Sequence, residues 1–372
     1  AESLTFAEID AARRDLAGFP RPGRRQIAAE RLIETSRKSP QQIVDWFAGQ
    51  EPQSAQGAMA LASAYRSLGR QGDAEELIRR WWRTRSFEAD VQRTMMTRFG
   101  AMLTVDDIAA RADILLYGAQ GPATRDVMAM LPAELRPAAE VRIALRADSP
   151  DAETLYQALA PADRQSPGVA FERAGYLRRK GLDAQALALT PLFPREVATA
   201  EQADRVWNER YRLTLAAIRS GDWKSAYQAA ANSGLTDGAD AAEAEFFAGW
   251  IALTRLNDPQ AAGRHFTAIE KIGSSPITRG RAFYWMGRAA EARGDKTGAE
   301  NAYAEGAQYN TTFYGQLAAE KAGLKLVLAH DPAPSAADRA RFEAREPVKA
   351  MRLLAGMGQM DLFRVFALHL DD

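Results

Sequence analysis

The sequence predicts an all-α protein, built as a solenoid of helical hairpins that forms a curved or ring-like α-superhelix. Ala, Leu, Arg, Glu and Gln dominate the 372 residues, and all five are strong helix formers, whereas β-branched residues are sparse. No convincing run alternates apolar and polar residues as a strand would. Pro and Gly fall mainly between helical stretches, and one turn motif recurs along the chain.

Composition and charge exclude several classes of protein. Lys plus Arg and Asp plus Glu both number 48, so the formal net charge is zero, and we expect no nucleic-acid partner because such proteins usually carry a basic excess. No apolar run approaches the roughly 18 residues of a membrane span. The absence of cysteine rules out disulfides and thiolate metal sites. The start at Ala1, without Met, is typical of an exported protein after removal of its signal peptide, and equally of a trimmed chain.

The first half of the chain shows helices without a clear register. Residues 1–60 are the least regular part. Farther along, helical patterns cover Val105–Tyr117 and Thr124–Met130, and Leu131–Leu135 looks like a short break because it contains a proline.

A turn motif marks the repeats. Each copy has Tyr or Trp in one helix, then Gly or Asn at a turn, and usually Asp at the start of the next helix. Gly or Asn suits a left-handed C-cap, and Asp can cap the helix that follows. The turn residues are Gly72, Gly181, Gly221, Asn257 and Gly294, of which the last four lie 40, 36 and 37 residues apart. Five residues after the turn comes a small residue that lets the helices approach: Ala186, Ala226, Ala262 and Ala299, with Leu77 as the exception.

A period of about 34–40 residues with two helices per unit is typical of tetratricopeptide-like solenoids. Hairpins that repeat loosely, without a regular solenoid, are the alternative. In the solenoid, we expect six aromatic residues to pack between helices, although a solvent-facing platform for sugars would use the same residue types. These residues are Phe247, Trp250, Phe266, Tyr284, Trp285 and Tyr303.

The last third of the chain predicts a hairpin, a further helix and a separate end. Arg281–Gly323 contains two antiparallel helices joined at Gly294–Asp295, and then a helix that carries Phe313–Leu317. After a linker that contains two prolines, two helices follow at Glu346–Leu354 and Met360–Leu370. The last one has an apolar stripe that packs either on a part not included in the sequence or on Met351 and Leu354. This stripe consists of Leu362, Val365, Phe366 and His369.

The residues predict no catalytic, metal or cofactor site. His265, His330 and His369 lie too far apart for a local metal site, and no phosphate loop, nucleophile elbow or zinc-binding helix motif occurs. Acid pairs such as Asp106–Asp107 fit solvated charges at helix starts. The cluster Arg79–Arg83 predicts a solvated face with two packed Trp side chains, or else contact with an anionic partner.

Several motifs stand out between about Thr199 and Gly323. The more specific ones are Arg281–Ala289 (RAFYWMGRA) and Thr312–Ala318 (TFYGQLA), and the others are Trp207–Arg210, Gly221–Trp223 and Phe247–Trp250. Through these motifs the segment resembles the superhelical domain of the soluble lytic murein transglycosylases. Residues 346–370 are similar to the start of that family's linker domain, and the first 190 residues fit the same architecture with weaker motifs.

The resemblance implies a periplasmic scaffold. In the family, a helical domain supports a goose-lysozyme-like domain, which cleaves the bond between N-acetylmuramic acid and N-acetylglucosamine and leaves a 1,6-anhydro sugar. That domain's Glu-Ser and Gly-Leu-Met-Gln motifs have no counterpart in a suitable context here, so no catalytic residue carries over. We therefore expect a superhelical domain at 1–323, a linker at 324–334, and the truncated start of a helical linker domain at 335–372.

The expected partners are glycan strands of peptidoglycan, a catalytic domain beyond this chain, and other cell-wall enzymes. Phe313, Tyr314 and Gln316 are candidate contacts with glycan or with that domain, although packing explains them equally well. The alternative function is that of a tetratricopeptide-like adaptor, which would bind proteins and have no glycan role.

Overall fold

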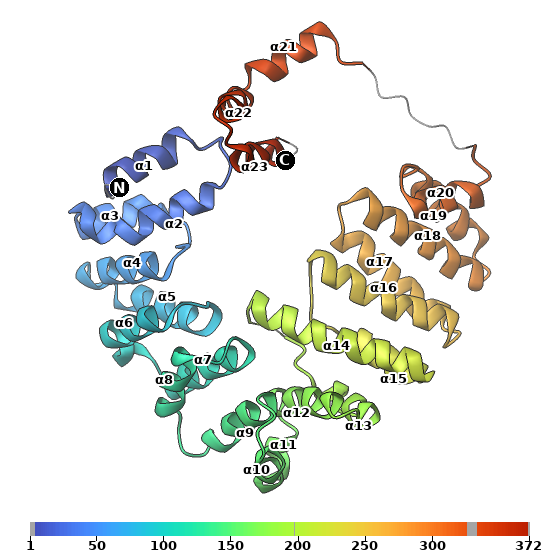
Figure 1. Ribbon diagram of the computed structural model, residues 1–372, viewed down its shortest axis with the longest axis horizontal. Helices are drawn as coiled ribbons and strands as arrows, with labels where there is room; N and C mark the ends of the chain where they lie inside the picture. The colour runs from blue at the N-terminus through green and yellow to red at the C-terminus, as the bar shows by residue number, and fades with distance from the viewer. Residues whose placement is uncertain (1–3, 197, 326–332, 371–372) are drawn as a thin grey trace. The chain divides into compact units, whose positions relative to one another are not determined.

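The computed structural model describes residues 4–196, 198–325 and 333–370, and within these ranges the chain is all-α, without a strand (Figure 1). It forms two compact units. One comprises residues 1–82, 87–103 and 330–372, and the other comprises residues 83–86 and 104–329. The predicted fold class is thus confirmed, whereas the predicted domain boundaries remain a prediction. Most of the predicted linker at 324–334, with His330, lies outside the described residues.

The first unit contains short helices from both ends of the chain. Several begin with a proline in the first turn, where a missing N–H costs nothing. Its helices are α1 (Phe6–Asp15), α2 (Pro22–Leu32), η1 (Ile33–Ser36), α3 (Pro40–Phe47), α4 (Ala55–Ser67), α5 (Gln71–Thr84), α6 (Ala89–Phe99), η2 (Gly100–Met102), α21 (Ala336–Ala344), α22 (Glu346–Gly356) and α23 (Met360–His369). Arg83 and Thr84, the last two residues of α5, belong to the other unit.

The second unit holds the longer helices. They are α7 (Val105–Tyr117), α8 (Pro122–Met130), α9 (Arg136–Arg146), α10 (Ala152–Ala158), α11 (Pro161–Arg164), α12 (Pro167–Arg179), α13 (Asp183–Leu187), η3 (Thr190–Leu192), α14 (Ala200–Ser220), α15 (Trp223–Ala230), α16 (Gly238–Thr254), α17 (Pro259–Ile272), α18 (Pro276–Ala292), α19 (Lys296–Ala307) and α20 (Phe313–Lys321). Val105–Tyr117 and the hairpin followed by a third helix after Arg281 agree with the sequence prediction.

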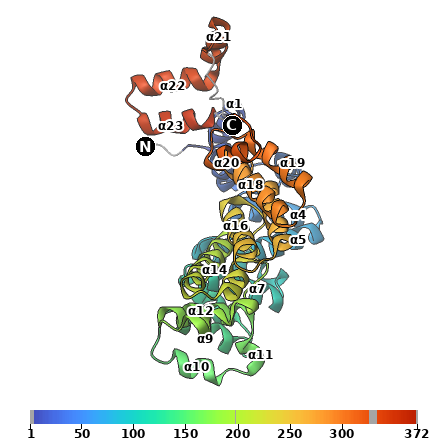
Figure 2. The same cartoon turned by 90° about the vertical axis from the view of Figure 1, so that its right-hand side faces the viewer.

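Consecutive helices of the second unit stack as hairpins. The pairs α14–α15, α16–α17 and α18–α19 pack internally, and each pair packs on the next one through α15–α16 and α17–α18. Figure 2 shows α12, α14, α16, α18 and α20 following one another in chain order. α20 closes against both helices of the last hairpin. This nearest-neighbour packing is the arrangement expected of a solenoid.

The turns show why the repeat is visible in the sequence. Gly181, Gly221 and Gly294 have φ of 75°, 76° and 75°, and Asn257 has φ of 53°. These left-handed values favour Gly or Asn because other side chains clash there. After the later turns, Asp222, Asp258 and Asp295 accept hydrogen bonds from backbone N–H groups in the first turn of the next helix.

The first copy of the motif has a different register from the one predicted. Its left-handed residue is Gly69, with φ of 75°, whereas Gly72 lies inside α5. With Gly69 as the turn, Ala74 is the small residue five positions later, and Leu77 is no longer an exception. Ala74, Ala186, Ala226, Ala262 and Ala299 are all buried, as close approach of paired helices requires.

The six aromatic residues pack between helices, as the solenoid interpretation predicts. Phe266, Tyr284 and Tyr303 are buried, and Phe247, Trp250 and Trp285 are partly buried against the same cores. Glycines make room for two of the rings. A Cβ at Gly249 would lie 2.6 Å from the ring of Phe266, and one at Gly287 would lie 2.4 Å from the ring of Tyr303.

The end of the chain has one helix more than predicted. Ser335 caps α21 through a reciprocal pair of hydrogen bonds with Asp338, a local signal that sequence analysis passed over. Within the first unit, α23 packs on α22, and its Phe366 lies edge-on to Phe19 with ring centroids 5.4 Å apart. Leu353, Met357 and Leu368 stay exposed on this pair. Among the described residues, no helix is long and apolar enough to cross a membrane.

Candidate functional site

The three predicted contact residues, Phe313, Tyr314 and Gln316, lie at the start of α20, where some side chains are exposed and others pack inward. Thr312 caps the helix by accepting a hydrogen bond from the Gly315 N–H at 3.1 Å. Only glycine fits at position 315, since a Cβ there would lie 1.9 Å from the carbonyl oxygen of Tyr309. This local geometry explains the Phe-Tyr-Gly-Gln motif as a tight entry into the helix.

Phe313 and Gln316 are the exposed members of the three. Phe313 is 69% exposed, and Gln316 lies three positions later, so that both are on one helical face. Tyr314 packs inward instead, with its ring centroid 5.5 Å from that of Tyr284 and 6.4 Å from that of Trp285. The structure therefore leaves two of the three side chains available to a ligand.

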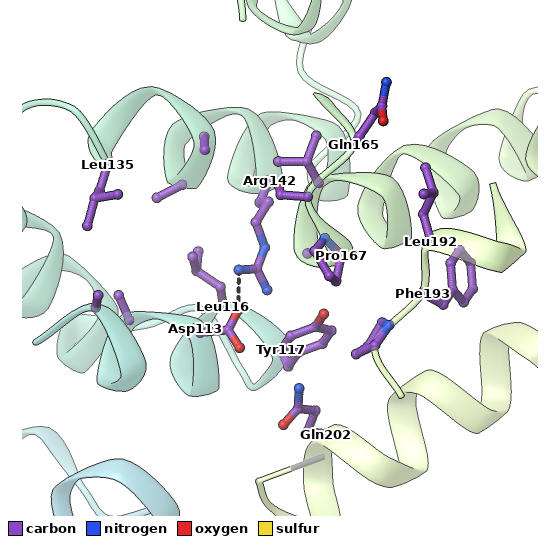
Figure 3. A pocket seen from close by; sticks show the side chains of 18 of the residues that line it. Asp113, Leu116, Tyr117, Leu135, Arg142, Gln165, Pro167, Leu192, Phe193 and Gln202 are labelled. Atoms are coloured by element: carbon purple, nitrogen blue, oxygen red, sulfur yellow. Dashed lines mark hydrogen bonds and ion pairs between the residues drawn. The ribbon is translucent and has the colours of Figure 1, made fainter. Parts of the chain in front are cut away.

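A second candidate is a cavity of about 800 Å³ in the second unit. It lies among α7, α9, the start of α12, η3 and the start of α14 (Figure 3). Its walls are mostly aliphatic, with Leu116, Leu131, Val169 and Phe193 buried, while Gln165 and Pro167 are exposed. This volume is typical of cavities that bind small molecules.

Arg142 is the buried cation of this cavity. It is only 6% exposed, and its Nη1 donates to an Asp113 carboxylate oxygen at 2.5 Å. Its Nε and Nη2 atoms have no hydrogen-bond partner. The guanidinium lies over the ring of Tyr117 at 4.6 Å, and a Cβ at Gly168 would come within 2.5 Å of its Cζ. An unpaired buried donor costs about 1–3 kcal/mol, so this edge is a site where a ligand acceptor would be favourable.

The charged residues behind Tyr117 form a separate network. Glu172 is 1% exposed, and one of its carboxylate oxygens accepts from Arg205 at 2.8 Å while the other has no partner. Burial raises the pKa of Glu172, although Arg205 and Arg142 partly offset that effect. Burial also raises the pKa of Tyr117. A raised carboxyl pKa is a feature of general acids, but Arg205 holds this group as an ion-pair partner.

A third group links three helices through His265. Its Nε2 lies 2.9 Å from the Tyr227 hydroxyl, and its Nδ1 lies 2.6 Å from a carboxylate oxygen of Glu245. In the sequence, His265 lies too far from the other histidines to predict a local metal site, and the structure adds this hydrogen-bonded chain between α15, α17 and α16. Among the described residues, no group of three or more His, Asp and Glu side chains is placed to hold a metal ion.

The sequence predicted that both carboxylates of the acid pair Asp106–Asp107 are solvated, and the structure shows that this holds for only one of them. Asp106 is exposed, but Asp107 is buried, and it pairs with Arg83 and accepts from the Thr104 N–H at 2.7 Å. The two tryptophans of the Arg79–Arg83 cluster, Trp81 and Trp82, are buried as predicted.

Comparison with solved structures identifies the fold. An inactive variant of the lytic transglycosylase Slt from Pseudomonas aeruginosa matches with a TM-score of 0.60 and 15% identity, over 99% of this chain and 58% of that one. The 70 kDa soluble lytic transglycosylase from Escherichia coli matches with a TM-score of 0.52 and 14% identity, over the same shares. The chain shares the α-superhelical fold of soluble lytic transglycosylases.

At this level of identity, the similarity concerns the fold alone. The chain spans 58% of the length of each of these two solved proteins. Comparison with protein-family models and with curated proteins gives no match. The helical arrangement that the sequence motifs suggested is thus confirmed, whereas the role of Phe313, Tyr314 and Gln316 stays a prediction.

Proposed function

We propose that this chain is the non-catalytic superhelical scaffold of a periplasmic lytic transglycosylase, an enzyme that cleaves peptidoglycan to 1,6-anhydromuropeptides through a separate catalytic domain. The observation that carries the proposal is the match of 99% of this chain to 58% of two lytic transglycosylases. In this role the stacked hairpins hold a glycan strand and orient the catalytic domain. Positioning of this kind can contribute several kcal/mol to catalysis without a reacting group.

The exposed start of α20 is the part of the scaffold that we assign to glycan contact. An aromatic face such as that of Phe313 packs against the apolar face of a sugar ring, and the amide of Gln316 can hydrogen-bond sugar hydroxyls. Tyr314 supports Phe313 from below, with ring centroids 5.1 Å apart. The catalytic domain and other cell-wall enzymes are the protein partners that this role implies.

Binding to purified peptidoglycan sacculi tests the proposal. We expect the 372-residue chain to cosediment with sacculi, and Phe313→Ala to weaken binding about five- to thirtyfold, equivalent to 1–2 kcal/mol. Phe342→Ala is the matched control, because Phe342 is also exposed, at 48%, but lies on α21. Equal losses in both variants would remove the assignment to α20. Failure to bind sacculi, together with capture of one specific protein, would favour the adaptor function.

Product analysis tests the non-catalytic part of the proposal. Incubation of sacculi with this chain alone should release no 1,6-anhydromuropeptide by mass spectrometry, whereas a complete lytic transglycosylase in parallel should release it. Release by this chain would show that it contains an active site and would overturn the scaffold assignment.

A further inference from the structure

The cavity around Arg142 has the features of a small-ligand site that is separate from the exposed face of α20. Its aliphatic wall is built by α7, α9 and α12, and its lining includes the exposed residues Gln165 and Pro167 (Figure 3). All the residues that line it belong to one compact unit, so that its geometry depends on a single packed body.

The guanidinium of Arg142 determines which ligand chemistry fits. Asp113 occupies Nη1, and the remaining Nε and Nη2 atoms lie on one edge of the planar group without a partner. This edge presents two parallel N–H donors, the arrangement that a carboxylate accepts with both oxygens. The ring of Tyr117 and the backbone at Gly168 both lie close to the guanidinium and fix its position.

The surroundings favour a singly charged ligand with an apolar body. The charged side chains that line the cavity are Arg142, Arg195, Asp113 and Glu196, so the lining carries no net positive charge that would favour a doubly charged group such as a phosphate. Leu116, Leu131 and Val169 offer apolar surface to an aliphatic chain. Because the free nitrogens are almost fully covered, the ligand must displace covering atoms near the first turn of α12, where Gly168 lies against the guanidinium.

We propose that this cavity binds a carboxylate carried on an aliphatic body, and that Arg142 receives the carboxylate through its Nε–Nη2 edge. Two sources share this chemistry: the C-terminal end of a short peptide of small apolar residues, and a short-chain fatty acid. The proposal does not depend on glycan binding, because it concerns different residues from those at the start of α20.

Matched probe pairs test the proposal on the 372-residue chain by isothermal titration calorimetry. The pairs are hexanoate with hexan-1-ol, and N-acetyl-Ala-Ala with its C-terminal amide. We expect the carboxylate of at least one pair to bind ten or more times as tightly as its neutral partner. Preference for the dipeptide identifies a peptide end, and preference for hexanoate identifies a fatty acid. Equal binding within each pair, or no binding at millimolar concentrations, would overturn the proposal.

Variants then locate the site. Arg142→Lys keeps the positive charge but loses the two-donor edge, so we expect at least a tenfold loss of carboxylate affinity. Arg125→Lys, an exposed arginine on α8 outside the cavity, should leave the affinity within twofold. Ala139→Leu narrows the cavity from α9 and should weaken binding even if Arg142→Lys fails to fold. Unchanged affinity in the Arg142→Lys and Ala139→Leu variants would place the carboxylate elsewhere and contradict the proposal.

Discussion

Asp107 is buried at the start of α7, where it pairs with Arg83, whereas its neighbour Asp106 is exposed. Asp107 follows Asp106 at the start of a helix, and nothing in the local pattern distinguishes the two. Only the packed structure shows that Arg83, twenty-four residues earlier, reaches Asp107. The sequence did not predict the buried charges of Arg142 and Glu172 for the same reason, because their environments come from helices far apart in the sequence. Phe313 and Gln316 are predicted contacts because a local motif marks them, and their role stays a prediction.

At this scale we predict different costs for two neighbouring substitutions. Asp107→Asn removes a buried carboxylate that pairs with Arg83 and accepts from Thr104, and should lower the free energy of unfolding by about 1–2 kcal/mol. Asp106→Asn, at an exposed position, should change it by less than about 0.5 kcal/mol. Urea unfolding followed by circular dichroism measures both. Equal costs would mean that the buried pair contributes nothing.

The same carboxylate should make stability depend on pH. Burial raises the pKa of Asp107, but hydrogen bonds from Thr104 and Arg83 outweigh this effect and lower the pKa below its ordinary value of 3.8. A lowered pKa in the folded state means that the stabilisation is present above pH 3.8 and is lost as the pH falls through the folded value. The difference between wild type and Asp107→Asn should therefore be full at pH 7 and shrink below pH 3.8. A constant difference would contradict this assignment.

Helices and turns were predictable because their signals are local. Left-handed glycines, the capping Asp that follows, and the buried alanine five residues on are all fixed by a few consecutive residues. The register error at Gly72 arose because Gly69 lies only three positions away, and a single sequence does not show which of two glycines adopts positive φ. The helix α21 was missed because its cap follows a proline-containing stretch that favoured a linker.

Two glycines should therefore respond in opposite ways to alanine. Gly221→Ala places a side chain at φ of 76° and should destabilise by about 1–2 kcal/mol. Gly72→Ala should stabilise by roughly 0.5–1 kcal/mol, because Gly72 lies in α5 with open space around its Cα. Chemical denaturation of each variant measures the sign. Destabilisation by Gly72→Ala would mean that Gly72, and not Gly69, adopts the left-handed conformation of the turn.

The division into two compact units could not be read from the sequence. Nothing in the sequence marks the boundaries near residues 82, 86 and 103, and only the boundary near residue 329 falls in the proline-containing stretch that predicted a linker. Stability in a stacked array is approximately a sum of local and nearest-neighbour contributions, so that distant parts need not unfold together.

For the whole molecule we predict thermal unfolding in two steps. Calorimetry should show two overlapping transitions rather than one two-state peak. Gly72→Ala, in the first unit, should raise one midpoint, and Gly221→Ala, in the second, should lower the other, each by about 2–4 °C per kcal/mol. A single transition that both variants shift would show that the two units unfold cooperatively.

The pairing of Gly249 with Phe266, and of Gly287 with Tyr303, bears on how such a chain can diverge. In each pair the glycine on one helix leaves space that the aromatic ring of the next helix fills. A larger residue in place of the glycine is therefore tolerated only together with a smaller residue in place of the aromatic one. Compensating exchanges of this kind preserve the distance between the two helices although both of the residues that determine it have changed. Helical arrays can thus follow the same path with little shared sequence, as the fold shared at 14–15% identity with the two solved transglycosylases illustrates.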